Sequence, residues 1–228
     1  MYHISFLGKD SLNIVNGIVF LKIFMCRSFF LPKFATSFSF HSMKKIVSVL
    51  VCCLCLLGAS AQVDKKYGIG TVPVVNGRVT LQRHASVSGV GSQEVFDKTV
   101  RWVEGRFVTP GVLKAKIVET DSATQRIVVN AEEYLTFRNT LLVLDRTRIN
   151  YWLEITAKED GYDMTMTRIA YWYEEERNGG QRFCAEEWIT DDECFNSKKT
   201  RLLRSSGKFR IKTIDLIDTL NKELNSKF

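Results

Sequence analysis

Two runs in which apolar and polar residues alternate, 146–155 and 162–173, constrain the fold of this chain more than any other feature. A period of two places the apolar side chains on one face of an extended strand, whereas a helix would need a period of about 3.6. Asp160 and Gly161 lie between the two runs, and both residue types are common in tight turns. The runs therefore predict an antiparallel hairpin and not a strand–helix–strand crossover.

Three shorter segments repeat the alternation, at 78–87, 113–117 and 127–131. The dipeptide Asn76-Gly77 precedes the first of them and is the strongest short signal for a hairpin, because both turn positions require a positive φ. The run at 162–173 carries apolar residues on both parities, with Met164, Met166 and Trp172 on one and Ile169, Tyr171 and Tyr173 on the other.

Two segments have the period of an amphipathic helix. In the first, Phe96, Val100, Val103 and Phe107 recur at intervals of four, three and four residues. In the second, the stripe consists of Ile214, Ile217, Leu220 and Leu224. Each stripe needs a flat apolar surface to pack on, so the expected order is a strand, a helix, about four antiparallel strands and a second helix.

Several stretches within this order resemble a family of uncharacterised secreted proteins from Gram-negative gut and oral bacteria. The resemblance rests on residues 72–79, 96–98, 100–102, 186–190, 208–210 and 213–215, and it extends over nearly all of the chain after residue 61. It implies an α+β domain with a TBP-like fold: a curved antiparallel sheet of five to six strands in β-α-β4-α order, with two helices on one face. The family brings no catalytic residues, and its fold does not define a function.

Residues 43–61 have the composition of a secretory signal peptide. Lys44 and Lys45 precede an apolar run at 46–57 that is too short to span a bilayer. Small residues then end at Ala61, so cleavage is expected before Gln62. The protein is therefore expected to be exported and to be periplasmic, envelope-associated or secreted.

Residues 1–42 precede this signal, and we interpret them as a spurious upstream extension before a true start at Met43. The alternative is a membrane anchor within 11–31. Lys22 and Arg27 lie in that stretch, and each charge near a helix centre costs about 2.5–3.5 kcal/mol. No stable transmembrane segment is expected in the mature chain.

The composition after residue 61 excludes several classes of function. Of the 32 Lys and Arg residues six lie before residue 62, as does one of the 25 acidic residues, which leaves 26 against 24 and a net charge of +2. That balance does not indicate nucleic acid as a partner. His84 is the only histidine left, so a multi-histidine metal site is excluded, and we interpret His84 as a polar strand residue. No cofactor is expected.

Two cysteines remain, Cys184 and Cys194, and in an oxidising compartment they predict a disulfide. The alternative is a pair of free thiols. Both lie in the polar segment 174–210, where an acidic half precedes a basic half. We interpret these charges as a solvated surface in which the two halves partly neutralise each other. The cysteine pair would be a local addition to the family.

The mature chain divides into four expected parts. Residues 62–71 are a flexible lead-in, and 72–173 form the α+β core. The polar segment follows, and 211–226 form a C-terminal helix that packs on the sheet.

With both helices on one face, the other face of the sheet is open and is expected to carry Trp152 or Trp172. An open face with aromatic side chains is a reasonable binding surface. The leading hypothesis is therefore a non-enzymatic module that binds an envelope protein, peptide, glycan or lipid.

Two alternatives come from other residues. A small-ligand carrier would have a pocket between sheet and helices, which Met164 and Met166 could line. A carboxylate-based hydrolase would use Glu132 and Glu133 or the glutamates at 174–176. Adjacent carboxylates in a strand point to opposite faces, which disfavours the Glu132–Glu133 pair.

Overall fold

The computed structural model describes residues 63–228 of the chain. Its strands are β1 (Val74–Val75), β2 (Arg78–Val79), β3 (Leu81–Ser86), β4 (Val112–Asp121), β5 (Arg126–Thr140), β6 (Val143–Lys158), β7 (Gly161–Tyr173) and β8 (Gln181–Cys184). Its α-helices are α3 (Ser92–Arg106), α4 (Asp191–Cys194) and α5 (Arg204–Asn225), and short 3-10 helices cover Lys65–Tyr67 (η1) and Ala185–Glu187 (η2).

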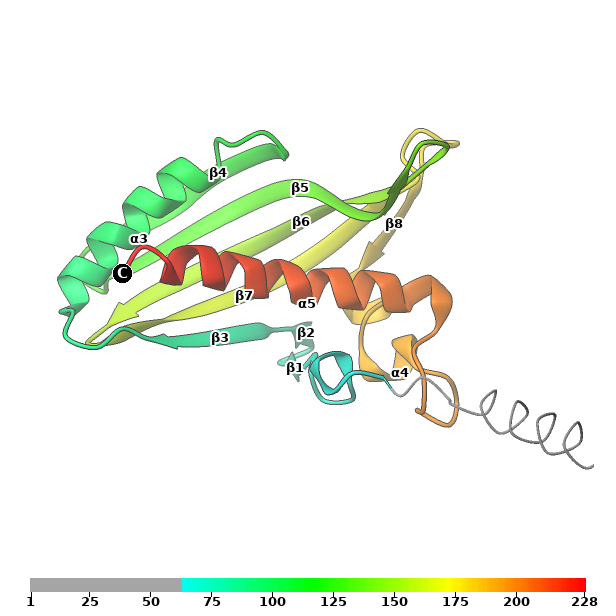
Figure 1. Ribbon diagram of the computed structural model, residues 1–228, viewed down its shortest axis with the longest axis horizontal. Helices are drawn as coiled ribbons and strands as arrows, with labels where there is room; N and C mark the ends of the chain where they lie inside the picture. The colour runs from blue at the N-terminus through cyan, green and yellow to red at the C-terminus, as the bar shows by residue number, and fades with distance from the viewer. Residues whose placement is uncertain (1–62) are drawn as a thin grey trace, which may run out of the picture. The chain divides into compact units, whose positions relative to one another are not determined.

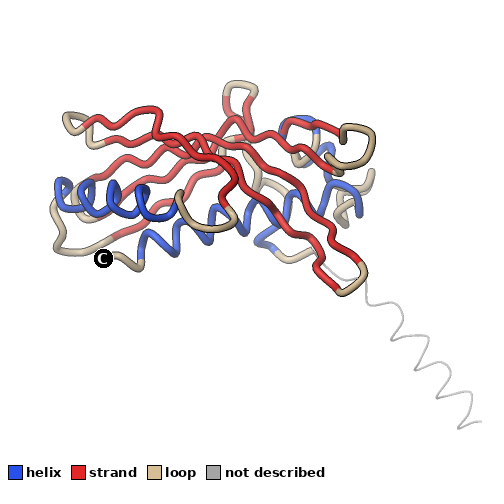
Figure 2. Tube along the Cα trace, turned by 90° about the horizontal axis from the view of Figure 1, so that it is seen from above, coloured by secondary structure: helices blue, strands red, loops and turns tan. Residues whose placement is uncertain are grey.

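The main sheet has six strands, in the order β3-β7-β6-β5-β4 with β8 paired to β7, and every pairing is antiparallel. Helices α3 and α5 lie across one face of this sheet (Figure 1), and the view from above places both on the same side (Figure 2). The predicted α+β fold and its β-α-β4-α order are confirmed. Strand β8 and the small β1–β2 hairpin are additions to that order.

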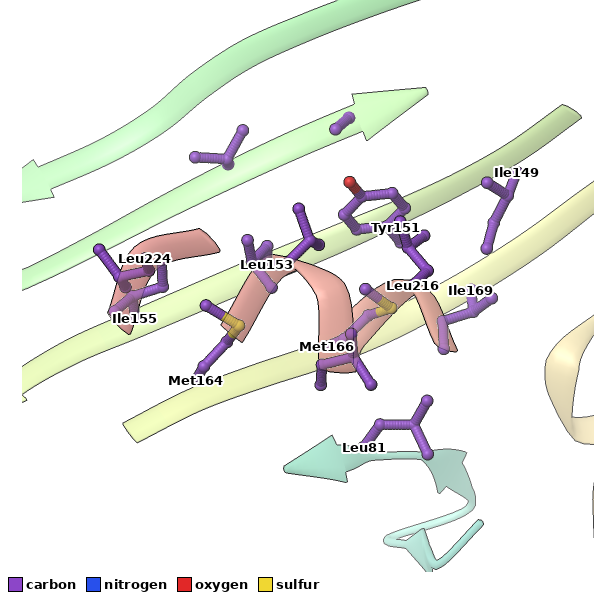
Figure 3. Packing of buried hydrophobic residues seen from close by; sticks show 14 of the residues in the cluster. Leu81, Ile149, Tyr151, Leu153, Ile155, Met164, Met166, Ile169, Leu216 and Leu224 are labelled. Atoms are coloured by element: carbon purple, nitrogen blue, oxygen red, sulfur yellow. The ribbon is translucent and has the colours of Figure 1, made fainter. Parts of the chain in front are cut away.

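The core lies between the sheet and the two helices. Figure 3 shows side chains of β6 and β7 gathered against α5, which contributes Leu216 and Leu224. The odd-numbered side chains of β6 from Ile149 to Ile155 are almost completely buried. The predicted helix stripes are also buried here, apart from the half-buried Val100. Removal of this apolar surface from water is the main force that holds the domain together.

A β-bulge explains why β7 carries apolar residues on both parities. The pairing with β6 shifts between Asn150 and Trp152, and Arg168 has a φ of 51°, so one extra residue is inserted at this point. Its insertion turns both sets of apolar side chains toward the helices, and the buried residues are Met164, Met166, Ile169 and Tyr171. Trp172 consequently faces the other side of the sheet.

The turns follow the chemistry that their residues require. Asn76 and Gly77 have φ values of 52° and 74°, as expected for the β1–β2 hairpin. Between β6 and β7 the two turn residues are Glu159 and Asp160, because Gly161 already pairs with β6. A Cβ atom at Gly161 would lie 2.2 Å from the carbonyl oxygen of Ala85, so this glycine allows β3 to approach β7 closely.

Helix α5 begins at Arg204 and not at 211, as the sequence predicted. The first two turns bury polar residues, including Ser206 and Arg210, in place of an apolar stripe, and the hydrophobic period therefore fails to mark them. The polar segment 174–210 consequently contains β8, η2, α4 and the start of α5.

The N-terminal segment was predicted to be a flexible lead-in, but residues 64–71 are bound to the rest of the domain. The guanidinium group of Arg210 donates to the carbonyl oxygens of Tyr67 and Gly68. The backbone N–H of Gly70 donates to the Asp191 carboxylate over 2.7 Å. The lead-in prediction fails because a buried guanidinium group needs acceptors for its N–H donors, and this segment supplies them.

The disulfide predicted between Cys184 and Cys194 is absent, and both residues are free thiols. The ring of Phe183 meets Phe209 of α5, so Phe183 points to the helix face of the sheet. Because side chains alternate along a strand, Cys184 points to the opposite face. Cys194 is instead buried beside Ser206 of α5, and burial raises the pKa of its thiol.

The signal peptide, its cleavage between Ala61 and Gln62, and the extension at 1–42 lie outside the described residues. Within 63–228, none of the helices is both long enough and apolar enough to cross a membrane.

Candidate functional site

The face of the sheet turned away from α3 and α5, called here the open face, carries a row of four side chains across four strands. Strand register places Tyr134 of β5 opposite Arg148 of β6. Arg148 is in turn opposite Trp172 of β7, and Trp172 is opposite Arg182 of β8. An aromatic ring therefore alternates with a guanidinium group along the row.

The two arginines flank the indole of Trp172. The guanidinium carbon of Arg148 lies 4.7 Å from its ring centroid, and that of Arg182 lies 4.3 Å away. Both distances are in the range of a cation–π interaction. The indole N–H donates to the carbonyl oxygen of Gly179 over 2.9 Å, which fixes the ring in place. The row is thus organised before any ligand arrives.

The arginines of this region differ in their ion pairs. Arg148 is held between the carboxylates of Glu132, at 2.9 Å, and Glu175. Burial lowers the pKa of Arg148, but these carboxylates outweigh that effect and the net pKa is raised. Arg182 is exposed, and within the described part of the chain it has no ion pair. Its donors are therefore available to a ligand.

A third arginine, Arg146 of β6, stacks on Tyr134 at the β5 end of the row. The guanidinium group of Arg146 lies 3.9 Å from the ring centroid of Tyr134. Its ion pair with Glu176 is long, at 3.7 Å, and the Glu176 side chain is 87% exposed. Such a pair contributes little to stability, so Arg146 is nearly as free as Arg182.

Two hollows flank Trp172. One, of about 570 Å³, is lined by the small residue Ala170 together with Asn150, Glu132 and Cys184. The other, of about 510 Å³, lies between the start of β6 and the β7–β8 loop. Both volumes are within the usual range of ligand pockets, and Arg148 and Trp172 line both hollows.

This arrangement suits recognition of an anion. A guanidinium group stacked on a ring keeps its in-plane N–H donors free, and two such donors match a carboxylate, phosphate or sulfate group. The stacked ring also reduces the conformational freedom that the arginine must lose on binding. The open face can therefore hold an acidic group without rearranging its aromatic residues.

The two predicted tryptophans both lie on the open face and are half-buried. Trp152 is covered by Arg168, whose guanidinium carbon lies 4.2 Å from a ring centroid. Arg146 and Arg182 were missed, because no sequence pattern shows which strands pair or in which register. His84 lies on the open face of β3, where its exposed ring contacts the Asp163 carboxylate.

The residues of the alternative hypotheses have other surroundings. Met164 and Met166 are fully buried in the core. Glu132 pairs with Arg148 on the open face, whereas Glu133 pairs with Arg106 on the helix face, as the strand alternation predicted. The glutamates at 174–176 are ion-paired with Arg177, Arg148 and Arg146, respectively.

A separate cavity of about 790 Å³ lies where the end of α3 meets β4, β5 and the end of α5. Glu133 lines it and accepts a hydrogen bond from the buried hydroxyl of Tyr151. Burial, followed by the charge of Glu133, raises the pKa of Tyr151 well above its ordinary value. Arg106 bridges Glu133 and Glu223 at 3.0 and 2.9 Å, so these polar groups satisfy one another.

The fold and site define a TBP-like α+β domain with an arginine-rich open face. Residues 82–172 match the model of a domain of unknown function with a TBP-like fold, DUF4468. The crystal structure of a DUF4468 family protein from Bacteroides ovatus is 30% identical, with a TM-score of 0.66, and the match covers 72% of this chain and 94% of that one. The chain belongs to the DUF4468 family.

A TBP-like protein from Parabacteroides distasonis shares the fold, with a TM-score of 0.56, 19% identity, and coverage of 69% of this chain and 96% of that one. No curated protein matches the chain. Residues 63–228 of this chain lie within a single compact unit.

Proposed function

We propose that this domain is a non-enzymatic binding module that holds an anionic ligand on its open face, beside Trp172. The observation that supports it most is the row in which Arg148 and Arg182 flank Trp172 while Arg182 has no carboxylate partner among residues 63–228. A carboxylate, phosphate or sulfate group would complete the pairing of that arginine.

The ligand of this site would lie in the cell envelope. A signal peptide at 43–61 would export the domain, so its ligand would be an acidic protein, peptide, glycan or lipid of the cell envelope. The two hollows would accommodate the groups on either side of the bound anion.

Titration calorimetry of residues 63–228 with acidic and neutral probes tests this function. Hexaglutamate and an oligogalacturonate are the acidic probes, and hexaglutamine is the neutral one. We expect only the acidic probes to bind. Arg182→Gln should weaken that binding by about tenfold, because one charge-assisted hydrogen-bond pair is lost.

The matched control is Lys222→Gln, which removes one exposed positive charge from α5, the helix on the opposite face of the sheet. It should leave the affinity within about twofold, since a distant surface charge is screened by salt. Equal weakening by both substitutions would show that only net charge matters. Equal binding of hexaglutamate and hexaglutamine would contradict an anion site altogether.

A small-ligand carrier is the second candidate, and the cavity of about 790 Å³ beside α3 favours it. Native mass spectrometry of the protein from its own host distinguishes the two candidates. A carrier would release additional mass on denaturation, and Trp102→Ala, which changes the cavity wall, would reduce that mass. Loss of the additional mass with Arg182→Gln would instead locate the ligand on the open face.

A further inference from the structure

The turn between β5 and β6 consists of two leucines that have no cover. Leu141 is 100% exposed and Leu142 is 91% exposed, and the next two residues, Val143 and Leu144, are also exposed. Two-residue hairpin turns normally use Asn, Asp or Gly, because these residues readily adopt the positive φ angles that such turns require. Four consecutive exposed apolar residues at a turn therefore indicate a contact surface.

The hairpin is extended beyond the rest of the sheet. Pairing of β4 with β5 reaches Glu133, and pairing of β7 with β6 reaches Thr147, so residues 136–146 form a two-stranded ribbon. In Figure 1 the ends of β5 and β6 reach the upper right edge of the domain. Two-stranded ribbons are marginal in water without other contacts.

The base of this ribbon is fixed to α5. The ring of Phe137 lies 4.7 Å from that of Phe209, and the Asp145 carboxylate accepts a hydrogen bond from Lys208 over 2.8 Å. The hydroxyl of Tyr173 donates to the same carboxylate over 2.9 Å. The ribbon is thus held in place at its base while its apolar tip projects into solvent.

We propose that this tip, Leu141–Leu144, inserts into the surface of a lipid bilayer that carries anionic headgroups. A short convex apolar tip matches the disordered boundary between acyl chains and headgroups, which apolar side chains enter to a depth of about 5–10 Å. It needs no complementary groove in a partner.

If the tip is inserted in this way, one cation of the ribbon lies at the depth of the lipid phosphates. Arg138 is exposed and has no ion pair within residues 63–228. It precedes Leu141 by three residues, or about 10 Å at the rise of a strand. With the leucines at the acyl boundary, Arg138 would lie among the phosphates. The other arginine of the ribbon, Arg146, is stacked on Tyr134 and has a long ion pair with Glu176, whereas Arg138 has neither a ring nor a carboxylate partner among residues 63–228.

Vesicle sedimentation of residues 63–228 tests the proposal. The probes are vesicles of phosphatidylcholine alone and vesicles with about one quarter phosphatidylglycerol. We expect binding to the anionic vesicles, and a loss of about tenfold or more in the double variant Leu141→Asp/Leu142→Asp. Arg138→Gln should reduce binding by about fivefold, the effect of one cation near an anionic surface.

The matched control is Val74→Asp/Val75→Asp, which adds the same charge to another exposed apolar hairpin. Its binding should stay close to that of the wild type. Thermal unfolding of each variant must match the wild type, as expected for side chains that are exposed. Equal binding by tip and control variants would overturn the proposal, as would a wild-type domain that sediments with neither vesicle. The second result would assign the tip to a groove on a protein partner.

Discussion

A single buried guanidinium group connects three segments that are distant in sequence. Arg210 is fully buried, and it donates to the carbonyl oxygens of Tyr67 at 3.0 Å and of Ile189 at 2.8 Å. Its ion pair with Asp191 measures 2.7 Å. The N-terminal segment, the η2–α4 region and α5 therefore share one polar centre. From sequence alone, Arg210 was predicted to lie in a solvated run of charges. The groups that accept its hydrogen bonds are distant in the sequence, and no sequence pattern marks them.

Replacement of Arg210 should be strongly destabilising. We expect Arg210→Met to lower the free energy of unfolding by about 3–5 kcal/mol, because the Asp191 carboxylate and several carbonyl oxygens lose their buried donor. Urea denaturation measures the change. Arg204→Met, at an exposed position of the same helix, should change stability by less than about 0.5 kcal/mol. Similar stabilities for the two variants would show that Arg210 is not the centre of this contact.

The strands and the two main helices could be predicted from the period of their apolar residues alone. Two features could not be predicted in this way, and each has a local cause. The bulge at Arg168 was hidden, because an inserted residue looks like a change of parity and only the partner strand reveals it. The start of α5 was missed because its buried side is polar. The open-face position of Trp152 followed from alternation. Trp172 faces the same side only because of the bulge, and the row that joins it to Arg182 depends on pairing with β8, a strand that lacks an alternating pattern of its own.

Two glycines in different elements should respond in opposite ways to alanine. A Cβ atom at Gly105 in α3 meets no atom within 4 Å, so Gly105→Ala should stabilise the domain by about 0.5–1 kcal/mol. In Gly161→Ala the new Cβ would lie against the backbone of Ala85 and displace β3. This substitution should therefore destabilise the domain by about 2 kcal/mol or more. Thermal unfolding measures both. The close approach of β3 to β7 would be refuted if Gly161→Ala left the stability unchanged.

At the scale of the whole molecule, ion pairs connect the sheet and the N-terminal segment to α5. Asp218 pairs with Lys66 at 2.8 Å and with Arg83 at 2.5 Å. Burial raises the pKa of Asp218, but these hydrogen bonds outweigh it and the net pKa is lowered. On the sheet, the hydrogen bond from Arg126 lowers the pKa of Glu154. The domain is therefore stabilised by carboxylates in their charged form.

The sign of the pH dependence follows from these directions. A carboxyl group whose pKa is lowered by folding stabilises the domain fully above its unfolded pKa of about 4, and this stabilisation is lost as the pH falls through the folded value. We expect the free energy of unfolding to fall as the pH is lowered below about 4. The free energy of unfolding of Asp218→Asn should fall less steeply over this range, and urea denaturation at pH 3, 4, 5 and 6 compares the variant with the wild type. Parallel curves for wild type and variant would contradict the assignment.

The open-face site is tested most directly through the indole N–H signals of the four tryptophans. The described domain contains all four, and the signal of Trp172 is assigned by its loss in Trp172→Phe. Sodium sulfate is titrated into labelled residues 63–228 against sodium chloride of equal ionic strength, and the chemical shifts are followed by NMR. Trp102 lies on the other side of the sheet and serves as the internal control.

We expect the Trp172 signal to shift saturably with sulfate while the Trp102 signal does not move. In Arg182→Gln the apparent affinity for sulfate should fall by about tenfold. A Trp172 signal that moves no more with sulfate than with chloride would contradict an anion site on the open face, as would an unchanged titration in Arg182→Gln.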